Sequence, residues 1–259
     1  MEITGLTKEK LRAMYETIII FIIVGFVAQI IDGALGMAYG VSSTTVLLGI
    51  GIPPATASAS VHTAEIFTSG VSGLSHLRLG NVDKKLFAKL LIPGVIGGAL
   101  GAYILTAVSG SIVKPFVAFY LLIMGVIILR KAFKRIQERN VRTKLFPLGL
   151  VGGFFDAVGG GGWGPIVTST LVARGHNPRF TVGSVNLAEF FVTVTEVATF
   201  LATIGLVQWQ VIVGLIVGGV LAAPLAAYVC KRLASKTLMI MVGTLIIALS
   251  IRTMYLALL

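Results

Sequence analysis

Long apolar segments with few polar interruptions dominate the chain. Residues 17–28 and 243–251, for example, contain no charged side chain. Such segments need surroundings that accept exposed Leu, Ile and Val, which means the interior of a lipid bilayer. We therefore predict an all-α polytopic membrane protein. Six apolar segments are long enough to cross the bilayer, at about 54–76, 86–106, 112–130, 178–204, 210–230 and 237–256.

The chain also contains an internal repeat. Shifting the sequence by 124 residues aligns residues 31–68 with 155–192 without a gap and gives twelve identities. Chance in so biased a composition would give only a few, so the chain consists of two homologous halves. We assign residues 1–135 to the first membrane repeat, 136–141 to a basic cytoplasmic linker and 142–259 to the second membrane repeat.

Each half begins with a broken apolar segment. The break is an aspartate followed by glycine-rich residues, at 32–40 in the first half and 156–164 in the second. The pieces beside the breaks are mostly shorter than the roughly 20 residues that one crossing needs. They lie at about 17–31, 37–51, 145–156 and 163–173. We expect a broken or re-entrant helix pair at each break, followed by three long transmembrane helices.

Composition supports the membrane class and restricts the topology. Only 12% of the residues are charged, against roughly 25% in soluble domains, and the mean hydropathy is +0.97. The net charge of +11 comes from basic residues clustered in short loops, which favours a topological role over nucleic-acid binding. If each broken pair returns to its own side, all four basic clusters lie in the cytoplasm: 78–89, 130–144, 174–179 and 231–236.

That arrangement places the two halves in opposite orientations, with both termini outside. It is an inverted repeat, as in many transporters. A parallel repeat, with four crossings in each half, remains the alternative.

Five of the ten acidic residues fall inside apolar segments. Placing a carboxylate at the bilayer centre costs at least about 2.5 to 3.5 kcal/mol, so these residues indicate function. Glu65 and Glu189 each follow a proline by eleven residues, which at about 1.5 Å per residue places both near the midplane. We predict coupling or gating roles, with proton coupling as one form, for Asp32, Glu65, Asp156, Glu189 and Glu196. Hydrogen bonding between helices is the alternative role.

The breaks themselves are candidate anion sites. A half-helix that begins inside the membrane presents free N–H groups and a positive dipole end, which bind an anion without Lys or Arg. Side chains near the breaks and on the polar faces of the long helices add further donors. The predicted substrate-binding residues are Tyr39, His62, Gly161, Gly162, Trp163 and Asn186.

The paired Asp-plus-glycine breaks, each followed by a proline and an Ala-Glu helix, resemble the sulfite exporter TauE/SafE family of bacterial membrane permeases. The resemblance covers both halves and is most specific at 156–165 and 186–189. It implies transport of small sulfur-containing anions, such as sulfite, sulfoacetate or related sulfonates, across the bacterial cytoplasmic (inner) membrane. His62 stands where the second half has Asn186, which departs from strict symmetry.

A cation or metal-ion transporter that uses the intramembrane carboxylates remains the second reading. An enzyme is not expected, because no metalloprotease or nucleophile motif is present. Cys230 is the single cysteine, which excludes an internal disulfide. We expect no cofactor, no bound metal and no nucleic acid. The expected partners are the lipid bilayer and a small anion, and the sequence leaves open whether the protein is a homo-oligomer.

Overall fold

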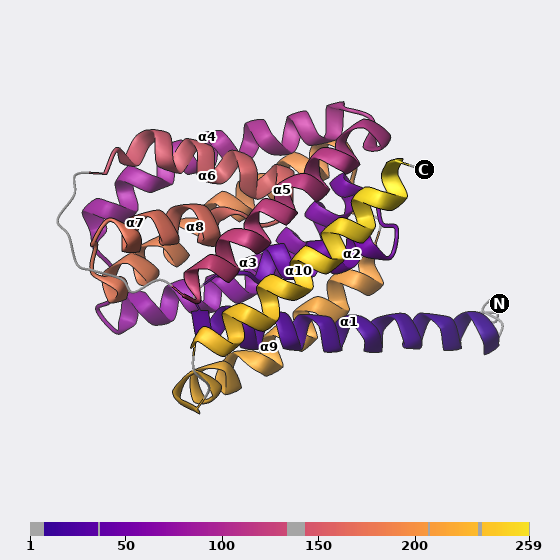
Figure 1. The fold of residues 1–259 in the computed structure, drawn as a ribbon, viewed down its shortest axis with the longest axis horizontal. Helices are drawn as coiled ribbons and strands as arrows, with labels where there is room; N and C mark the ends of the chain where they lie inside the picture. Colours follow the sequence, from indigo (N-terminus) through magenta and orange to yellow (C-terminus); the bar gives the residue numbers. More distant parts are fainter. Residues whose placement is uncertain (1–7, 36, 134–142, 207, 233–234, 259) are drawn as a thin grey trace, which may run out of the picture.

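The protein is helical throughout the residues that the computed structural model describes, which are 8–35, 37–133, 143–206, 208–232 and 235–258 (Figure 1). The predicted linker at 136–141 lies outside these residues. In chain order the helices are α1 (Lys8–Leu35), α2 (Tyr39–Gly49), α3 (Pro54–Arg78), α4 (Lys84–Ala107), α5 (Gly110–Lys131), α6 (Leu145–Gly159), the π-helical turn η1 (Gly164–Thr168), α7 (Ser169–Ala173), α8 (Pro178–Thr203), α9 (Trp209–Arg232) and α10 (Ser235–Leu258).

All six predicted long segments are helices, with ends within a few residues of the expected positions. Proline at the first helical position begins α3 and α8, as its fixed φ angle favours. Asp83 begins α4 by accepting hydrogen bonds from the N–H groups of Lys85 and Leu86. These local signals explain why the helix starts could be predicted.

Five helices among the described residues are long and apolar enough to cross a membrane. Four of them are predicted long segments, in α4, α5, α8 and α10, and the fifth lies in α1 at Met14–Asp32. The prediction of a short half-helix is therefore wrong for α1. Residues 8–16 are mostly strong helix formers, such as Lys, Glu, Leu and Arg, which extend this helix toward the N-terminus.

Among the long helices, α3 is too polar to count among these five. α3 is 25 residues long but carries many Ser and Thr residues together with His62 and Glu65. α9, by contrast, is apolar along most of its length, including the described stretch Trp209–Ala222. α3 thus contains two of the predicted site residues, His62 and Glu65.

The main helix contacts connect the two halves. α1 lies against α9, α4 against α6, α3 against α8 and α5 against α10 (Figure 1). The sequence repeat makes α1 equivalent to α6, α3 to α8, α4 to α9 and α5 to α10. Exchanging every helix for its equivalent returns the same four pairs. Each half is therefore packed chiefly against the other half.

The equivalent helices in the α3–α8 and α5–α10 pairs run antiparallel. In each pair, residues with higher numbers on one helix contact residues with lower numbers on the other. The contacts are Gly70 with Phe190 and Gly73 with Leu187 for α3 and α8, and Gly125 with Ile246 and Leu129 with Gly243 for α5 and α10.

Glycine permits the closest of these contacts. Gly214 and Gly218 on α9 lie directly against α1, where the nearest residues include Phe21 and Phe26. α1 and α9 therefore run parallel. Gly97 and Gly101 on α4 lie against the backbone of α6 in the same way. Small residues allow such close approach between membrane helices.

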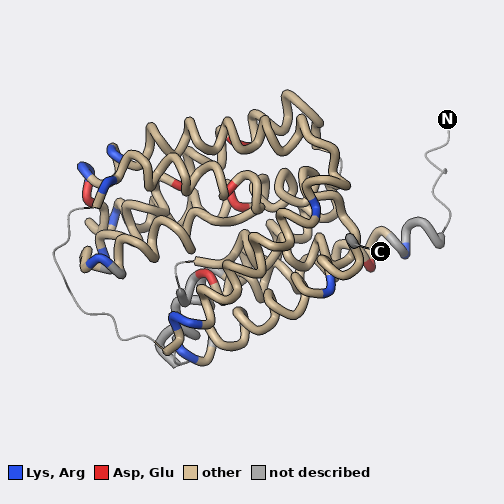
Figure 2. Tube along the Cα trace, turned by 45° about the horizontal axis from the view of Figure 1, so that its top comes forward, with Lys and Arg blue, Asp and Glu red and all other residues tan. Residues whose placement is uncertain are grey.

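The charged residues are unevenly distributed (Figure 2). Most Lys and Arg residues lie toward one side of the molecule, at the left and lower left of Figure 2, whereas several Asp and Glu residues lie inside the helical body. Of the five acids predicted inside apolar segments, Glu65, Asp156 and Glu196 are buried, and Asp32 and Glu189 are partly buried.

Candidate functional site

The two glycine-rich breaks meet inside the molecule. Gly40, at the start of α2, lies against the backbone of Gly160 and Gly161, which follow α6. The Thr44 hydroxyl donates a hydrogen bond of 2.6 Å to the Gly160 carbonyl. Gly161 has φ +141°, in a region that other residues rarely adopt, and the backbone of Val41 leaves no room for a side chain there. Glycine is therefore required at this junction.

Each break is closed by its own aspartate. Asp156 Oδ1 accepts hydrogen bonds from the N–H groups of Gly162 (2.6 Å) and Trp163 (2.9 Å). Asp32 Oδ1 accepts one from the N–H of Tyr39 at 3.3 Å. The Gly161 N–H donates to the Asp156 backbone carbonyl. The N–H groups that the sequence analysis offered to a substrate anion are thus engaged by the protein's own oxygens in this structure.

Tyr39 and Trp163 occupy equivalent positions beside the breaks, and both side chains are fully buried. The Tyr39 hydroxyl donates to the Leu215 carbonyl on α9 at 3.3 Å. Trp163 Nε1 donates to the Val185 carbonyl on α8 at 3.0 Å. In this structure each aromatic side chain therefore links its break to a long helix of the bundle.

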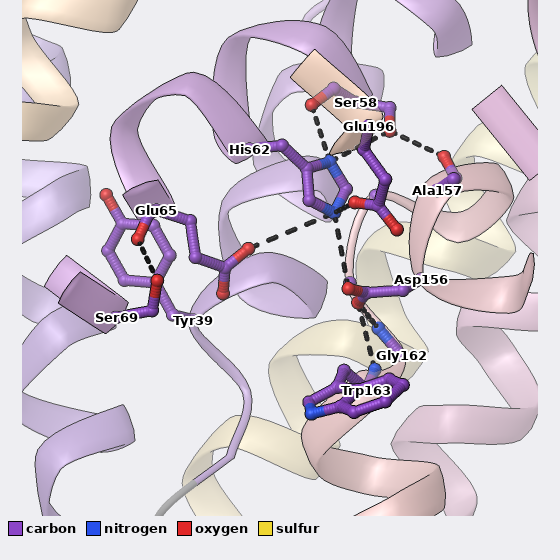
Figure 3. A network of polar contacts seen from close by, with 12 residues as sticks. Tyr39, Ser58, His62, Glu65, Ser69, Asp156, Ala157, Gly162, Trp163 and Glu196 are labelled. Atoms are coloured by element: carbon purple, nitrogen blue, oxygen red, sulfur yellow. Dashed lines mark hydrogen bonds and ion pairs between the residues drawn. The ribbon is translucent and has the colours of Figure 1, made fainter. Parts of the chain in front are cut away.

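A cluster of ionisable side chains lies next to the second break (Figure 3). His62 of α3 points toward Glu196 of α8 and Asp156 of α6. Its Nε2 atom lies 3.0 Å from Glu196 Oε2, 3.7 Å from Asp156 Oδ2 and 3.9 Å from Oε2 of Glu65, one helical turn away on α3. All four side chains are buried, and those of His62 and Glu196 are entirely inaccessible to solvent. We call these four residues the central cluster.

The His62 ring is held from its other side. Nδ1 lies 2.8 Å from the Ser58 carbonyl and 3.1 Å from the Ser58 hydroxyl. The Ser58 hydroxyl donates to the Ala157 carbonyl at 2.6 Å, so its proton is used there. Nδ1 must therefore carry the proton that bonds the Ser58 carbonyl. In a neutral ring, Nε2 is then an unprotonated acceptor that faces carboxylate oxygens.

The structure brings together four of the eleven predicted site residues in the central cluster. Gly161, Gly162 and Trp163 lie beside it through Asp156, and Asp32 and Tyr39 are joined at the first break. Asn186 and Glu189 are not members of this cluster, although Glu189 lies near enough to interact electrostatically with Glu65 and Asp156. The Asn186 amide donates to the Ser72 hydroxyl at 2.8 Å. Glu189 makes no ion pair or hydrogen bond with the central cluster within the described residues.

Sequence reasoning missed some residues that shape this region. Ser58 precedes His62 by four residues, so the spacing of a helix could have placed it on the same face. Tyr120 donates its hydroxyl to the Gly161 carbonyl at 3.3 Å, and no local pattern indicates that contact. Lys131 Nζ lies 3.5 Å from the Pro165 carbonyl in η1. These contacts arise only once α5 lies against the second break.

The comparisons with known proteins agree with this architecture. The model of the family described as sulfite exporter TauE/SafE matches residues 21–253. The chain is 43% identical over 247 residues to the probable membrane transporter protein YtnM of Bacillus subtilis (strain 168), covering 92% of this chain and 82% of that protein. It is 29% identical over 172 residues to the probable membrane transporter protein ORF9 of Sinorhizobium sp, covering 65% of this chain and 60% of that protein. No solved structure matches the chain. This protein therefore belongs to the sulfite exporter TauE/SafE family of membrane transporters.

Proposed function

We propose that this protein is a permease of the bacterial cytoplasmic membrane that carries a small sulfur oxyanion or organosulfonate, such as sulfite or sulfoacetate. The observation that carries the proposal is the buried ionisable centre between α3 and α8, in a chain whose family is named for sulfite export. Ionisable groups inside a membrane bundle mark the paths of ions and substrates. The family favours an anion as cargo over the cation alternative, and a carrier over an enzyme.

An inverted repeat is part of the proposal. Two equivalent helices that cross antiparallel are related by an axis perpendicular to both of them. The antiparallel α3–α8 and α5–α10 pairs therefore support an axis in the plane of the membrane, as in transporters with inverted repeats. In such proteins the substrate binds where the repeats meet, which corresponds here to the breaks and the neighbouring faces of α3 and α8.

The chemistry of the second break supports an oxyanion as the cargo. Two consecutive N–H groups, of Gly162 and Trp163, bind a carboxylate oxygen of Asp156. A sulfite or sulfonate oxygen is a similar acceptor, and helix ends in glycine-rich loops bind such groups well. We propose that Asp32 and Asp156 act as gates. When a gate releases its N–H groups, they become available to the substrate.

Glu189 is the acid that we assign to proton coupling. It lies near the middle of α8, it is partly buried, and no basic side chain pairs with it among the described residues. An ionised carboxylate near a bound anion repels it, whereas a protonated one does not. Proton binding at Glu189 would thus favour the loaded carrier. Glu65 and Glu196, which face His62, complete the proposed coupling and gating set.

A basic surface hollow supports an anion pathway. A cavity of about 350 Å³ beside the start of α6 is lined by residues that include Lys144, Arg174 and Thr170. It lies on the side that the positive-inside rule assigns to the cytoplasm. Positive charge around such a hollow raises the local concentration of anions.

The test of the proposed function is anion binding by purified protein in detergent. Thermal stability is measured with sulfite, sulfoacetate, taurine, sulfate, thiosulfate, acetate and chloride, and each stabilising anion is followed by calorimetry. We expect stabilisation by at least one sulfur anion. Replacing Asn186→Leu should abolish this response, because it removes a donor while side-chain volume changes little. Stabilisation by no sulfur anion would contradict the proposal.

Ser72→Ala is the matched control for Asn186→Leu. Asn186 donates to the Ser72 hydroxyl, so both variants lose the same interhelical hydrogen bond. If Asn186 contacts the anion, only Asn186→Leu loses binding. Equal loss in both variants would assign Asn186 a structural role and remove it from the binding site.

A further inference from the structure

Several polar atoms of the central cluster lack hydrogen bonds, and all except Glu196 Oε1, which lies beside Gly98, point toward its middle. They are His62 Nε2, Glu65 Oε2, Asp156 Oδ2 and both carboxylate oxygens of Glu196. Each lies on a buried side chain. Burying polar atoms without partners is costly, and natural proteins rarely do so without a reason. The cluster therefore needs a further chemical species to satisfy these atoms.

Two of these side chains are held by hydrogen bonds on the side that faces away from the middle of the cluster. His62 is held at Nδ1 by the Ser58 carbonyl, and Asp156 is held at Oδ1 by two backbone N–H groups. Bonds of this kind orient the inner atom of each group toward the centre. Metal-binding His and Asp residues are supported in the same way, by a hydrogen bond to the atom that does not touch the metal.

The geometry around His62 Nε2 is compatible with a metal ion at the centre of the cluster. His62 Nε2 lies 3.0 Å from Glu196 Oε2, a contact that lacks the angle of a hydrogen bond, and 3.7 Å from Asp156 Oδ2, which is too long for one. Ligand atoms bound at about 2.1 Å to a tetrahedral ion lie about 3.4 Å apart. Their lone pairs point at the ion and not at one another. The two observed distances lie on either side of that value.

We propose that His62, Asp156 and Glu196 form a resident binding site for one divalent transition-metal ion, with Glu65 as a fourth ligand. One ligand atom from each of the first three residues lies within 4.8 Å of the others, so small rotations of the carboxylates bring them to a single ion. A neutral His62, ionised Asp156 and Glu196 and a divalent ion have no net charge together, which suits a buried site, and a protonated Glu65 keeps this balance. Imidazole with carboxylates is a ligand set for zinc or manganese.

The site would have a structural consequence for the carrier. Its ligands come from α3 in the first half and from α6 and α8 in the second, so the ion would connect the halves beside the second break. The ion would also balance the charge of the buried carboxylates, beside which no Lys or Arg lies among the described residues. The sequence alone predicts no bound metal, because the three ligands lie far apart along the chain. The proposal does not depend on which anion is transported.

The test measures metal content directly, without a transport assay. The full chain in detergent is treated with a chelator, incubated with zinc sulfate, separated from free metal by gel filtration and analysed for zinc. We expect one zinc ion per chain in the natural sequence. Glu196→Gln and His62→Gln should weaken zinc binding at least about tenfold. Glu16→Gln is the control, since it makes the same change at an exposed position of α1 that pairs with Arg12, and it should retain the ion.

Three results would overturn the proposal. One is a natural chain that holds no more zinc, manganese or cobalt than Glu196→Gln. Another is an equal loss of zinc by the Glu16→Gln control. The last is radioactive zinc accumulating inside proteoliposomes, which would make the ion cargo. If Glu196→Gln and His62→Gln fail to fold, cobalt(II) added to the natural chain gives the answer. Visible absorption typical of four or five ligands supports the site, and the spectrum of hydrated cobalt contradicts it.

Discussion

Gly40 and Gly161 lie in backbone contact, so that the break of one half touches the break of the other. A β-carbon at residue 40 would lie 2.6 Å from the Gly161 α-carbon and 2.9 Å from the Gly160 carbonyl oxygen. Neither neighbour is a flexible side chain that could move aside. The two candidate substrate-binding segments are therefore positioned by each other.

Gly40→Ala should destabilise the protein because overpacking at a rigid contact costs about 1–3 kcal/mol. The measurement is the melting temperature of the purified protein in detergent. Gly49→Ala is the matched control at the other end of α2, where the nearest atoms to a new β-carbon lie 3.8 and 3.9 Å away. It should be neutral or slightly stabilising. Equal melting temperatures for the two variants would show that the breaks are not in contact.

Asp156→Ala should be more damaging than an ordinary loss of a helix cap. It leaves the N–H groups of Gly162 and Trp163 buried without acceptors, at a cost of about 1–3 kcal/mol each. Asp83→Ala is the control, since Asp83 caps α4 with a similar pair of bonds at an exposed end where water replaces them. That loss should cost about 0.5–2 kcal/mol. A smaller effect at Asp156 than at Asp83, measured by thermal unfolding, would contradict the observed cap.

The proposed topology predicts where engineered cysteines can be labelled. In a Cys230→Ser background, Lys236→Cys should react with a membrane-impermeant maleimide only when the reagent reaches the cytoplasm. Leu206→Cys, in the loop between α8 and α9, should react in intact cells. Both positions are exposed in the structure. Labelling of Lys236→Cys from outside would support the parallel repeat instead.

Glu189→Gln should leave the protein folded but change the pH dependence of transport. A neutral amide can neither gain nor lose the coupling proton, so the pH response assigned to Glu189 should disappear from uptake in proteoliposomes. Glu16→Gln is the control, because Glu16 is exposed and paired with Arg12 on α1. It should reproduce the natural pH profile. An unchanged profile in Glu189→Gln would remove the coupling role from this residue.

The sequence predicts where the helices lie along the chain better than it predicts which helices pack against one another. Apolar length marks the spans, and Pro54 and Pro178 mark two starts, because these signals act within a few residues. His62 and Glu65 face one region, as their spacing of three residues on a helix favours. The extension of α1 was missed because its added residues are polar, so hydropathy does not register them.

The central cluster could be predicted only in part. Glu196 and Asp156 are recognisable as costly intramembrane acids, but their approach to His62 depends on how α6 and α8 cross α3. The sequence contains no local signal for that crossing. The hydrogen bonds from the N–H groups of Gly162 and Trp163 to Asp156 depend on a loop in which Gly160 and Gly161 have positive φ. Composition alone does not determine the path of that loop.

The parallel contact between α1 and α9 has a consequence for synthesis. α1 leaves the ribosome first, yet the helix that covers its Gly25 is close to the end of the chain, at Leu215. Until α9 has been translated and inserted, α1 has only lipid or provisional neighbours on that side. Final assembly therefore has to wait for almost the whole chain. Truncations after α8 should leave α1 without its partner and open to capture by membrane quality-control proteases.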